Sequence, residues 1–199
     1  VSSGFNSPRG IGTYALNQPI SGPGIRPQRY CTDFTVNNAT YATLPGQAIP
    51  HGVGWVFCSA LWELTWELIN DPSTTGIDPN IYNFAGTGGN VVALRLVMEG
   101  LRTQPCQPGF ISARDAILRA DTTLYGASHA CAIWRAFARR GMGFGASQGS
   151  TSSITDQVVS FVTNPLCAVG PTVTINQAAA QPDPASTSPI NFTAVFSEP

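Results

Sequence analysis

The chain has 199 residues, of which 43% are hydrophobic and 11% are charged, and its formal net charge is −1. This length suits one sizeable core with an appendage. A charge so near zero gives no electrostatic reason to expect nucleic acid or anionic lipid as a partner, since both would call for a basic patch. We also expect no membrane span, because no apolar run reaches the roughly 18 residues that a spanning helix needs. The chain opens on Val1 without a signal segment, which suggests an excised or processed piece.

Residues 1–50 are rich in Gly, Pro, Ser and Asn and sustain neither a helical nor a strand period. Turn-forming sequences recur throughout this region, which predicts a long stretch of loops. Loops of such length in a compact domain usually carry function or cover a site. Arg26 lies here, in GPGIRPQRY, where flanking prolines stiffen the backbone. Without further information, the ordinary interpretation of Arg26 is an exposed, solvated side chain.

Residues 51–70, HGVGWVFCSALWELTWELIN, have the strongest helical period of the chain. Apolar residues recur at steps of three and four, which predicts one buried helix face. That face contains Val53, Val56, Phe57, Ala60, Leu61, Leu64 and Leu68, and a second stripe beside it contains Trp55, Ser59, Trp62 and Trp66. A helix with so little polar surface is expected at the centre of the fold, with His51 at its start.

Three further helices are predicted, over residues 90–104, 110–125 and 129–140. In the first, Asn90 is expected to cap the N-terminus. Its expected inward residues are Val91, Leu94, Val97, Met98 and Leu101. In the last, Arg135, Arg139 and Arg140 occupy the final turns, where the helix dipole favours cations. His129, at the beginning of that helix, is expected at the surface.

The composition of the sequence changes after the last predicted helix. Residues 141–153 have the composition of a flexible linker, residues 154–162 indicate a strand or an extended segment, and residues 172–177 and 189–196 alternate like half-buried strands. We therefore divide the chain into a helical domain at 1–148, a linker with a short extended segment at 149–170, and a β tail at 171–199.

Five cysteines occur without a CxxC spacing, which argues against a zinc ribbon or a thioredoxin-type motif and favours disulfides. Cys106 and Cys131 each lie near a helix end, so we expect a bridge between them. Cys58 lies within the central helix and is expected to be a small core residue. Cys31 and Cys167 then remain as a second candidate pair.

Three runs resemble a known family: PHGVGWVFCSALWELTWELI, GGNVVALRLVMEGLRTQPCQPGFISARDAILRAD and CAIWRAFARRGMGFGAS. They are similar to the C-terminal helical half of fungalysins, secreted zinc metalloendopeptidases of the thermolysin-like superfamily, over about residues 20–148. The tail, PTVTINQ with SPINFTAVFSEP, resembles the opening of a bacterial immunoglobulin-like repeat. The resemblance implies a secreted, mainly α protein: the helical C-terminal domain of thermolysin-like peptidases, with long N-terminal loops and a short β tail.

The resemblance also implies two site residues. In the superfamily, a histidine at the head of the central helix donates a hydrogen bond to the oxyanion of the tetrahedral intermediate, and an arginine in the preceding loop binds the substrate carbonyl. By position, His51 and Arg26 match these roles. The acidic residue that often partners the histidine is not evident in LPGQAIP, at residues 44–50.

The sequence departs from the family in its metal ligands. Zinc peptidases of this superfamily need HExxH and a downstream glutamate, whereas the two histidines here, His51 and His129, are 78 positions apart (129 − 51) and neither lies in HExxH. We therefore expect no metal site and no cofactor in this chain. Zinc belongs to the complete enzyme, whose metal-binding half we expect upstream of Val1, so whether this chain acts as an enzyme depends on that partner.

Two functions are compatible with the sequence. In the first, the chain is the substrate-binding, non-metal half of a secreted zinc metalloendopeptidase that hydrolyses peptides and is inactive alone. In the second, it is a non-catalytic extracellular structural or adhesive module. Such a module would assemble as a homo-oligomer through residues 171–199, by strand addition into a ring or filament.

Overall fold

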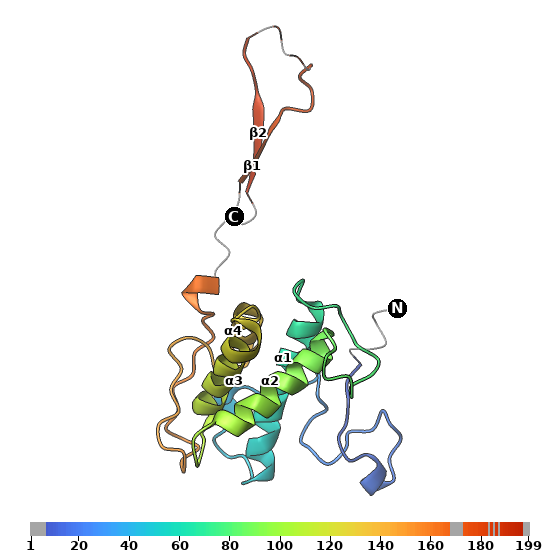
Figure 1. Cartoon of the computed structure of the whole chain (residues 1–199), viewed down its shortest axis with the longest axis vertical. Coiled ribbons are helices and arrows are strands. Elements are labelled where there is room, and N and C mark those ends of the chain that lie inside the picture. Colours follow the sequence, from blue (N-terminus) through green and yellow to red (C-terminus); the bar gives the residue numbers. More distant parts are fainter. Residues whose placement is uncertain (1–6, 168–172, 183, 185, 187, 197–199) are drawn as a thin grey trace. The chain divides into compact units, whose positions relative to one another are not determined.

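The computed structural model describes residues 7–167, 173–182, 184, 186 and 188–196. The chain divides into two compact units, residues 1–167 and 168–199. The described part of the first unit contains α1 (His51–Asn70), α2 (Gly89–Thr103), α3 (Phe110–Tyr125) and α4 (Ala130–Arg139), which pack together after a long run of loops (Figure 1). The prediction of a mainly α fold is confirmed, and each predicted helix is present within one residue at either end.

α1 is the central helix, as expected, because it packs against both α2 and α4. Four residues of its predicted face are fully buried: Val56, Ala60, Leu64 and Leu68. The prediction that Cys58 lies in the core is wrong, since its side chain is exposed. At about 100° of rotation per residue, Cys58 is turned about 200° from Val56 and lies on the other side of the helix.

The predicted inward face of α2 is wrong for three of its five residues. Leu94, Met98 and Leu101 are 48%, 61% and 55% exposed. Val91 is buried as predicted, and Val97 is partly buried against the core. The helix also buries Gly89, Val92, Ala93, Leu96 and Gly100. Small residues let the neighbouring helix approach closely, and a Cβ atom added at Gly100 would lie 3.0 Å from the side chain of Ile117 on α3. Close packing through small side chains therefore decided the orientation of α2.

The start of α2 differs from its prediction as well. Gly88, and not Asn90, is the N-cap residue, and it makes no side-chain cap. The Asn90 side chain instead pairs with Asp78 in the preceding loop. It accepts a hydrogen bond from the backbone N–H of Asp78 at 2.8 Å and donates one to the carbonyl of Asp78 at 2.9 Å. This pair fixes the loop between α1 and α2 on the start of α2.

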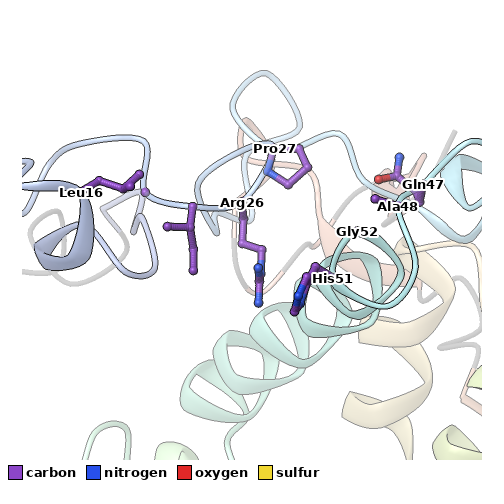
Figure 2. A pocket seen from close by; sticks show the side chains of 9 residues that line it. Leu16, Arg26, Pro27, Gln47, Ala48, His51 and Gly52 are labelled. Carbon is purple, nitrogen blue, oxygen red and sulfur yellow. The ribbon is translucent and has the colours of Figure 1, made fainter.

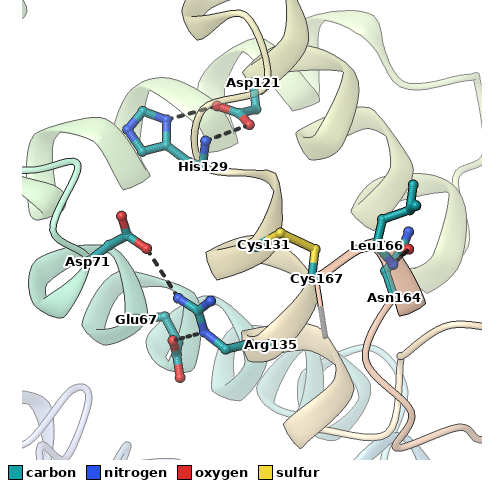
Figure 3. Close-up of a disulfide and its surroundings, with 9 residues drawn as sticks. All are labelled: Glu67, Asp71, Asp121, His129, Cys131, Arg135, Asn164, Leu166 and Cys167. Carbon is teal, nitrogen blue, oxygen red and sulfur yellow. Dashed lines mark hydrogen bonds and ion pairs between the residues drawn. A yellow bond between two sulfur atoms is a disulfide. The ribbon is translucent and has the colours of Figure 1, made fainter. Parts of the chain in front are cut away.

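His129, expected at the surface, is buried and only 4% exposed. Asp121 of α3 holds it by two contacts, one from the backbone N–H of His129 at 3.0 Å and one from its ring Nδ1 at 2.8 Å (Figure 3). Because both carboxylate oxygens of Asp121 are used, the pair fixes the turn between α3 and α4. This histidine is a structural residue of the helical bundle.

Arg140 joins three parts of the first unit, although its position after α4 had suggested only a contact with the helix dipole. Its side chain is completely buried. It donates to Oε2 of Glu63 on α1 at 2.9 Å. It also donates to the carbonyls of Asn37 at 2.8 Å, Ala39 at 3.0 Å and Cys31 at 2.7 Å. Arg140 thereby fastens the loop at residues 31–39 to α1 and α4.

The segment after α4 runs back along itself. Met142 pairs with Ser160 in a parallel bridge, and Ser147 pairs with Val158 in an antiparallel bridge. Arg114 of α3 is buried beside this segment and donates to the carbonyls of Met142 and Gly143 at 2.7 and 2.8 Å. The extended conformation expected for residues 154–162 is present at these bridges. The proposed domain boundary at residue 148 stays a prediction.

The expected disulfide between Cys106 and Cys131 is wrong. Cys131 pairs with Cys167 (Figure 3), with a Cα–Cα distance of 5.2 Å. Cys106 is exposed and unpaired among the described residues. Cys106 precedes the 16-residue helix α3 and Cys131 follows it. A helix of that length separates its ends by about 24 Å, far beyond the reach of a disulfide. The second candidate pair, Cys31 with Cys167, is excluded by the same bridge.

The tail forms a two-stranded antiparallel sheet. β1 (Val173–Gln177) pairs with β2 (Phe192–Phe196) in a register that runs from Val173 opposite Phe196 to Gln177 opposite Phe192. Both predicted strands are therefore present, the second shorter than expected, while residue 172 lies outside the described residues. The immunoglobulin-like character of the tail and its use in assembly stay predictions. None of the described helices combines the length and the apolar character that crossing a bilayer requires.

Candidate functional site

His51 is the first residue of α1, and its side chain is exposed. Pro50 precedes it as the N-cap residue and makes no side-chain cap. The N–H groups of Gly52 and Val53 in this turn donate to the carbonyl of Ala48, at 2.7 and 3.3 Å, while the helix dipole is positive at this end. The location therefore favours negative charge near the imidazole of His51.

A surface cleft of about 620 Å³ opens at this end of α1. Its walls come from the N-terminal loops and from the entry to the helix: Leu16, Gly24, Ile25, Arg26, Pro27, Gln47, Ala48, His51 and Gly52. Figure 2 shows the Arg26 side chain running from its loop toward the His51 ring, which projects from the first turn of α1. The fold thus brings together the two candidate residues, which are 25 positions apart (51 − 26) in the sequence.

The loop that carries the arginine of the cleft is held by backbone contacts. Arg9 and Tyr30 exchange two hydrogen bonds of 2.9 and 2.8 Å, and the N–H of Ile25 donates to the carbonyl of Ile11 at 2.9 Å. Gly24 has a φ of +76°, and a Cβ atom there would lie 2.3 Å from the Ile11 carbonyl oxygen. Only glycine fits this crossing. These contacts fix the loop against the segment at residues 9–11.

The polar side chains of the cleft are mainly hydrogen-bond donors. The guanidinium of Arg26 carries donors only, and the His51 ring donates through at least one nitrogen. Among the residues that line the cleft in the described part of the chain, none is acidic. The arrangement can bind a carbonyl oxygen or an oxyanion, and it offers no carboxylate to act as a base.

The cleft does not fit the zinc ion that the family resemblance implies. Across the described ranges, no group of three His, Cys, Asp or Glu side chains is placed to hold a metal ion. His51 has no second histidine beside it, because His129 is paired with Asp121 between α3 and α4. The described residues that line the cleft supply no carboxylate and no second histidine, and Arg26 and His51 are its candidate hydrogen-bond donors.

The chain is similar to fungal metalloproteinases. It is 40% identical over 139 residues to extracellular metalloproteinase 4 of Arthroderma gypseum. The aligned stretch covers 68% of this chain and 21% of that protein. It is 41% identical over 144 residues to the probable extracellular metalloproteinase 4 of Arthroderma benhamiae, with 71% and 22% covered. The extracellular metalloproteinase 4 of Trichophyton soudanense is 42% identical over 139 residues, with 68% and 35% covered. The chain spans about a fifth to a third of the length of these relatives.

The family profile covers the whole described helical bundle and the loops before it. The match extends over residues 2–146, which include the cleft and all four helices, and it ends before the tail. The same region carries the similarity predicted from the sequence. The chain belongs to the fungalysin metallopeptidase family (M36).

Proposed function

We propose that this chain forms the substrate-binding side of the active-site cleft in a secreted zinc metalloendopeptidase. The zinc ligands and the general base are supplied by a region of the longer protein outside these residues. The observation that carries the proposal is the common cleft of Arg26 and His51 at the start of α1. Family membership supports it, because relatives are named as metalloproteinases.

In this proposal the two side chains bind the peptide at its reacting carbonyl and at the next one. His51 donates a hydrogen bond to the oxyanion that develops during attack on the scissile carbonyl, and Arg26 donates to the substrate carbonyl on the leaving-group side. Donors aimed at developing negative charge are among the strongest contributions to catalysis. The dipole of α1 adds to the positive potential at the same place.

We further propose that the protein works outside the cell. The relatives carry the word extracellular in their names. The bridge between Cys131 and Cys167 fits an oxidising compartment, since disulfides persist there and are rare in the cytosol.

The proposal predicts that the 199-residue chain neither binds stoichiometric zinc nor cleaves peptides, whereas a longer family chain that includes HExxH does both. The reason is that this chain lacks the ligand set. Metal analysis of purified protein and cleavage of a fluorogenic peptide measure the two properties. One zinc bound tightly per 199-residue chain, with peptide cleavage, would contradict the division of roles between the two halves.

The tail favours a second candidate function, that of an assembly module. Val173, Ile175 and Phe192 lie on one face of the β1–β2 sheet and are all exposed. A lone two-stranded sheet is marginal in water, so further strands from another part of the protein or from a second copy would stabilise it.

Assembly through the tail predicts that the full-length chain forms oligomers and that a chain ending at Gly170 does not. Light scattering during size-exclusion chromatography measures both masses. If both chains are monomeric, the tail is not an assembly element.

A further inference from the structure

Gln47 lies in the short loop that leads into α1, and it forms part of the wall of the cleft. Its backbone N–H donates to the carbonyl of Leu44 at 3.0 Å, and the Leu44 side chain is buried. The carbonyl of the next residue, Ala48, accepts from two N–H groups of the first turn of α1. The loop is thus attached on both sides of Gln47, to the core and to the helix that carries His51.

The Gln47 side chain lies against Gly52 in the first turn of α1. A Cβ atom added at Gly52 would lie 2.9 Å from Oε1 of Gln47 and 3.2 Å from its Cβ. The glycine therefore leaves the space that the Gln47 side chain occupies. Both residues line the cleft, and Figure 2 shows them where the loop meets the helix. The carboxamide of Gln47 is thus placed at the cleft wall, beside the residue that follows His51.

The carboxamide of Gln47 has no hydrogen-bond partner within the described part of the chain. The other two glutamines of the N-terminal loops use theirs to hold the backbone. Oε1 of Gln18 accepts from the N–H of Gly24 at 2.8 Å, and Oε1 of Gln28 accepts from the N–H of Asn38 at 3.1 Å. The carboxamide of Gln47 therefore remains available to a ligand in the cleft.

Gln47 gives the cleft a hydrogen-bond acceptor. Its Oε1 is the only side-chain oxygen among the described residues that line the cleft. Arg26 carries donors only, and His51 acts as a donor in its proposed role. A peptide presents backbone N–H groups as well as carbonyls, and an N–H group that loses water without gaining an acceptor weakens binding. The cleft thus offers two donors for substrate carbonyls and one side-chain acceptor for a substrate N–H.

We infer that Gln47 is a further substrate-binding residue, whose carboxamide oxygen accepts a hydrogen bond from a backbone N–H of the bound peptide. Arg26 and His51 bind carbonyl oxygens of the same peptide. The inference deepens the proposed function and rests on it, since it concerns the same ligand in the same cleft. The hydrogen bond is present both in the bound substrate and in the transition state, so its loss should appear in KM.

The test is Gln47→Met in the longer zinc-containing peptidase, with a fluorogenic peptide as substrate. Methionine has nearly the length of glutamine and removes the carboxamide. We expect KM to rise about threefold to tenfold, the size of one lost hydrogen bond between uncharged groups, with kcat within about twofold of the parent. The thermal unfolding temperature should stay unchanged, because the carboxamide makes no hydrogen bond within the described part of the chain. An unchanged KM would overturn the inference.

Gln47→Glu tests whether the acceptor oxygen is what matters. A carboxylate keeps two acceptor oxygens at the same place and loses only the N–H donors of the carboxamide. Its KM should stay within about twofold of the parent value. If Gln47→Glu raised KM as much as Gln47→Met, the acceptor would not be the group that binds the peptide, and the inference would be wrong.

A matched change in the substrate identifies the N–H group. In a series of peptides, each amide except the scissile one is replaced in turn by an ester, which removes one N–H with little change in shape. At one position the ester should raise the KM of the parent about as much as Gln47→Met does. The same ester should change the KM of Gln47→Met by less than about twofold. Additive effects at every position would contradict a hydrogen bond from the substrate to Gln47.

The matched control is Gln104→Met. Gln104 is the C-cap residue of α2 and does not line the cleft, and its side chain has no partner within the described part of the chain. Its KM and kcat should equal those of the parent. A rise in KM as large as that of Gln47→Met would show an effect unrelated to the cleft and would overturn the inference.

Two further variants separate this inference from the proposed function. If Arg26→Ala raises KM and Gln47→Met does not, the inference alone is wrong. If neither Arg26→Ala nor His51→Ala changes KM or kcat, the proposed function fails, and this inference fails with it.

Discussion

Replacing His51 with alanine in the longer zinc peptidase should lower kcat about 10²–10³-fold, equivalent to about 2.7–4 kcal/mol, with a much smaller change in KM. An oxyanion donor acts mainly on the transition state, so its loss appears in kcat. His51 is exposed at the first position of α1, and its removal leaves no cavity in the core. Steady-state kinetics on a fluorogenic peptide measure both constants.

Two comparisons make the His51 experiment specific. His51→Gln keeps an N–H donor at the end of a side chain and should recover part of the lost kcat. The thermal unfolding temperature of both variants should match that of the parent, because the side chain makes no buried contact. An unchanged kcat in His51→Ala would mean that His51 matches the family histidine in position but has no catalytic role.

Replacing Arg140 with methionine in the 199-residue chain should reduce the free energy of unfolding by about 3–5 kcal/mol. The substitution leaves Glu63 buried without its main partner, and it removes the donor to the carbonyls of Cys31, Asn37 and Ala39. Burial already raises the pKa of Glu63, against the influence of Arg140 and Arg139. Urea denaturation followed by circular dichroism measures the loss.

A matched surface arginine provides the control for Arg140. Arg135 pairs with Glu67 at 3.0 Å and Asp71 at 3.1 Å (Figure 3), but its side chain is 42% exposed. Arg135→Met should therefore cost at most about 1 kcal/mol. Combining Arg140→Met with Glu63→Leu should recover part of the stability, because the buried charge is then removed as well. Equal losses from Arg135→Met and Arg140→Met would contradict this account.

The helices could be predicted from the sequence because their signals are local. Periodic apolar residues and flanking glycines located all four within one residue. The orientation of α2 could not, since it depends on how closely Gly100 approaches Ile117, a contact between two helices. The role of Arg140 could not be predicted for the same reason. Its partner Glu63 is 77 positions away in the sequence, and the carbonyls that Arg140 binds are still more distant.

The candidate site, too, could be predicted only in part from the sequence. The positions of His51 and Arg26 came from the family resemblance, and the shared cleft was found only in the folded chain. The bridge to Cys167 was missed because that cysteine lies in a segment without periodicity.

The bridge between Cys131 and Cys167 would keep the chain covalently connected after a cleavage of the backbone between these two residues. It spans 36 positions, and the stretch at residues 149–152 within that span is exposed to any peptidase in the medium. A single cleavage there would separate the backbone into two pieces that remain covalently joined through the sulfur atoms. The β tail would stay attached to α4, and the damage would become visible as two fragments only after reduction of the bridge.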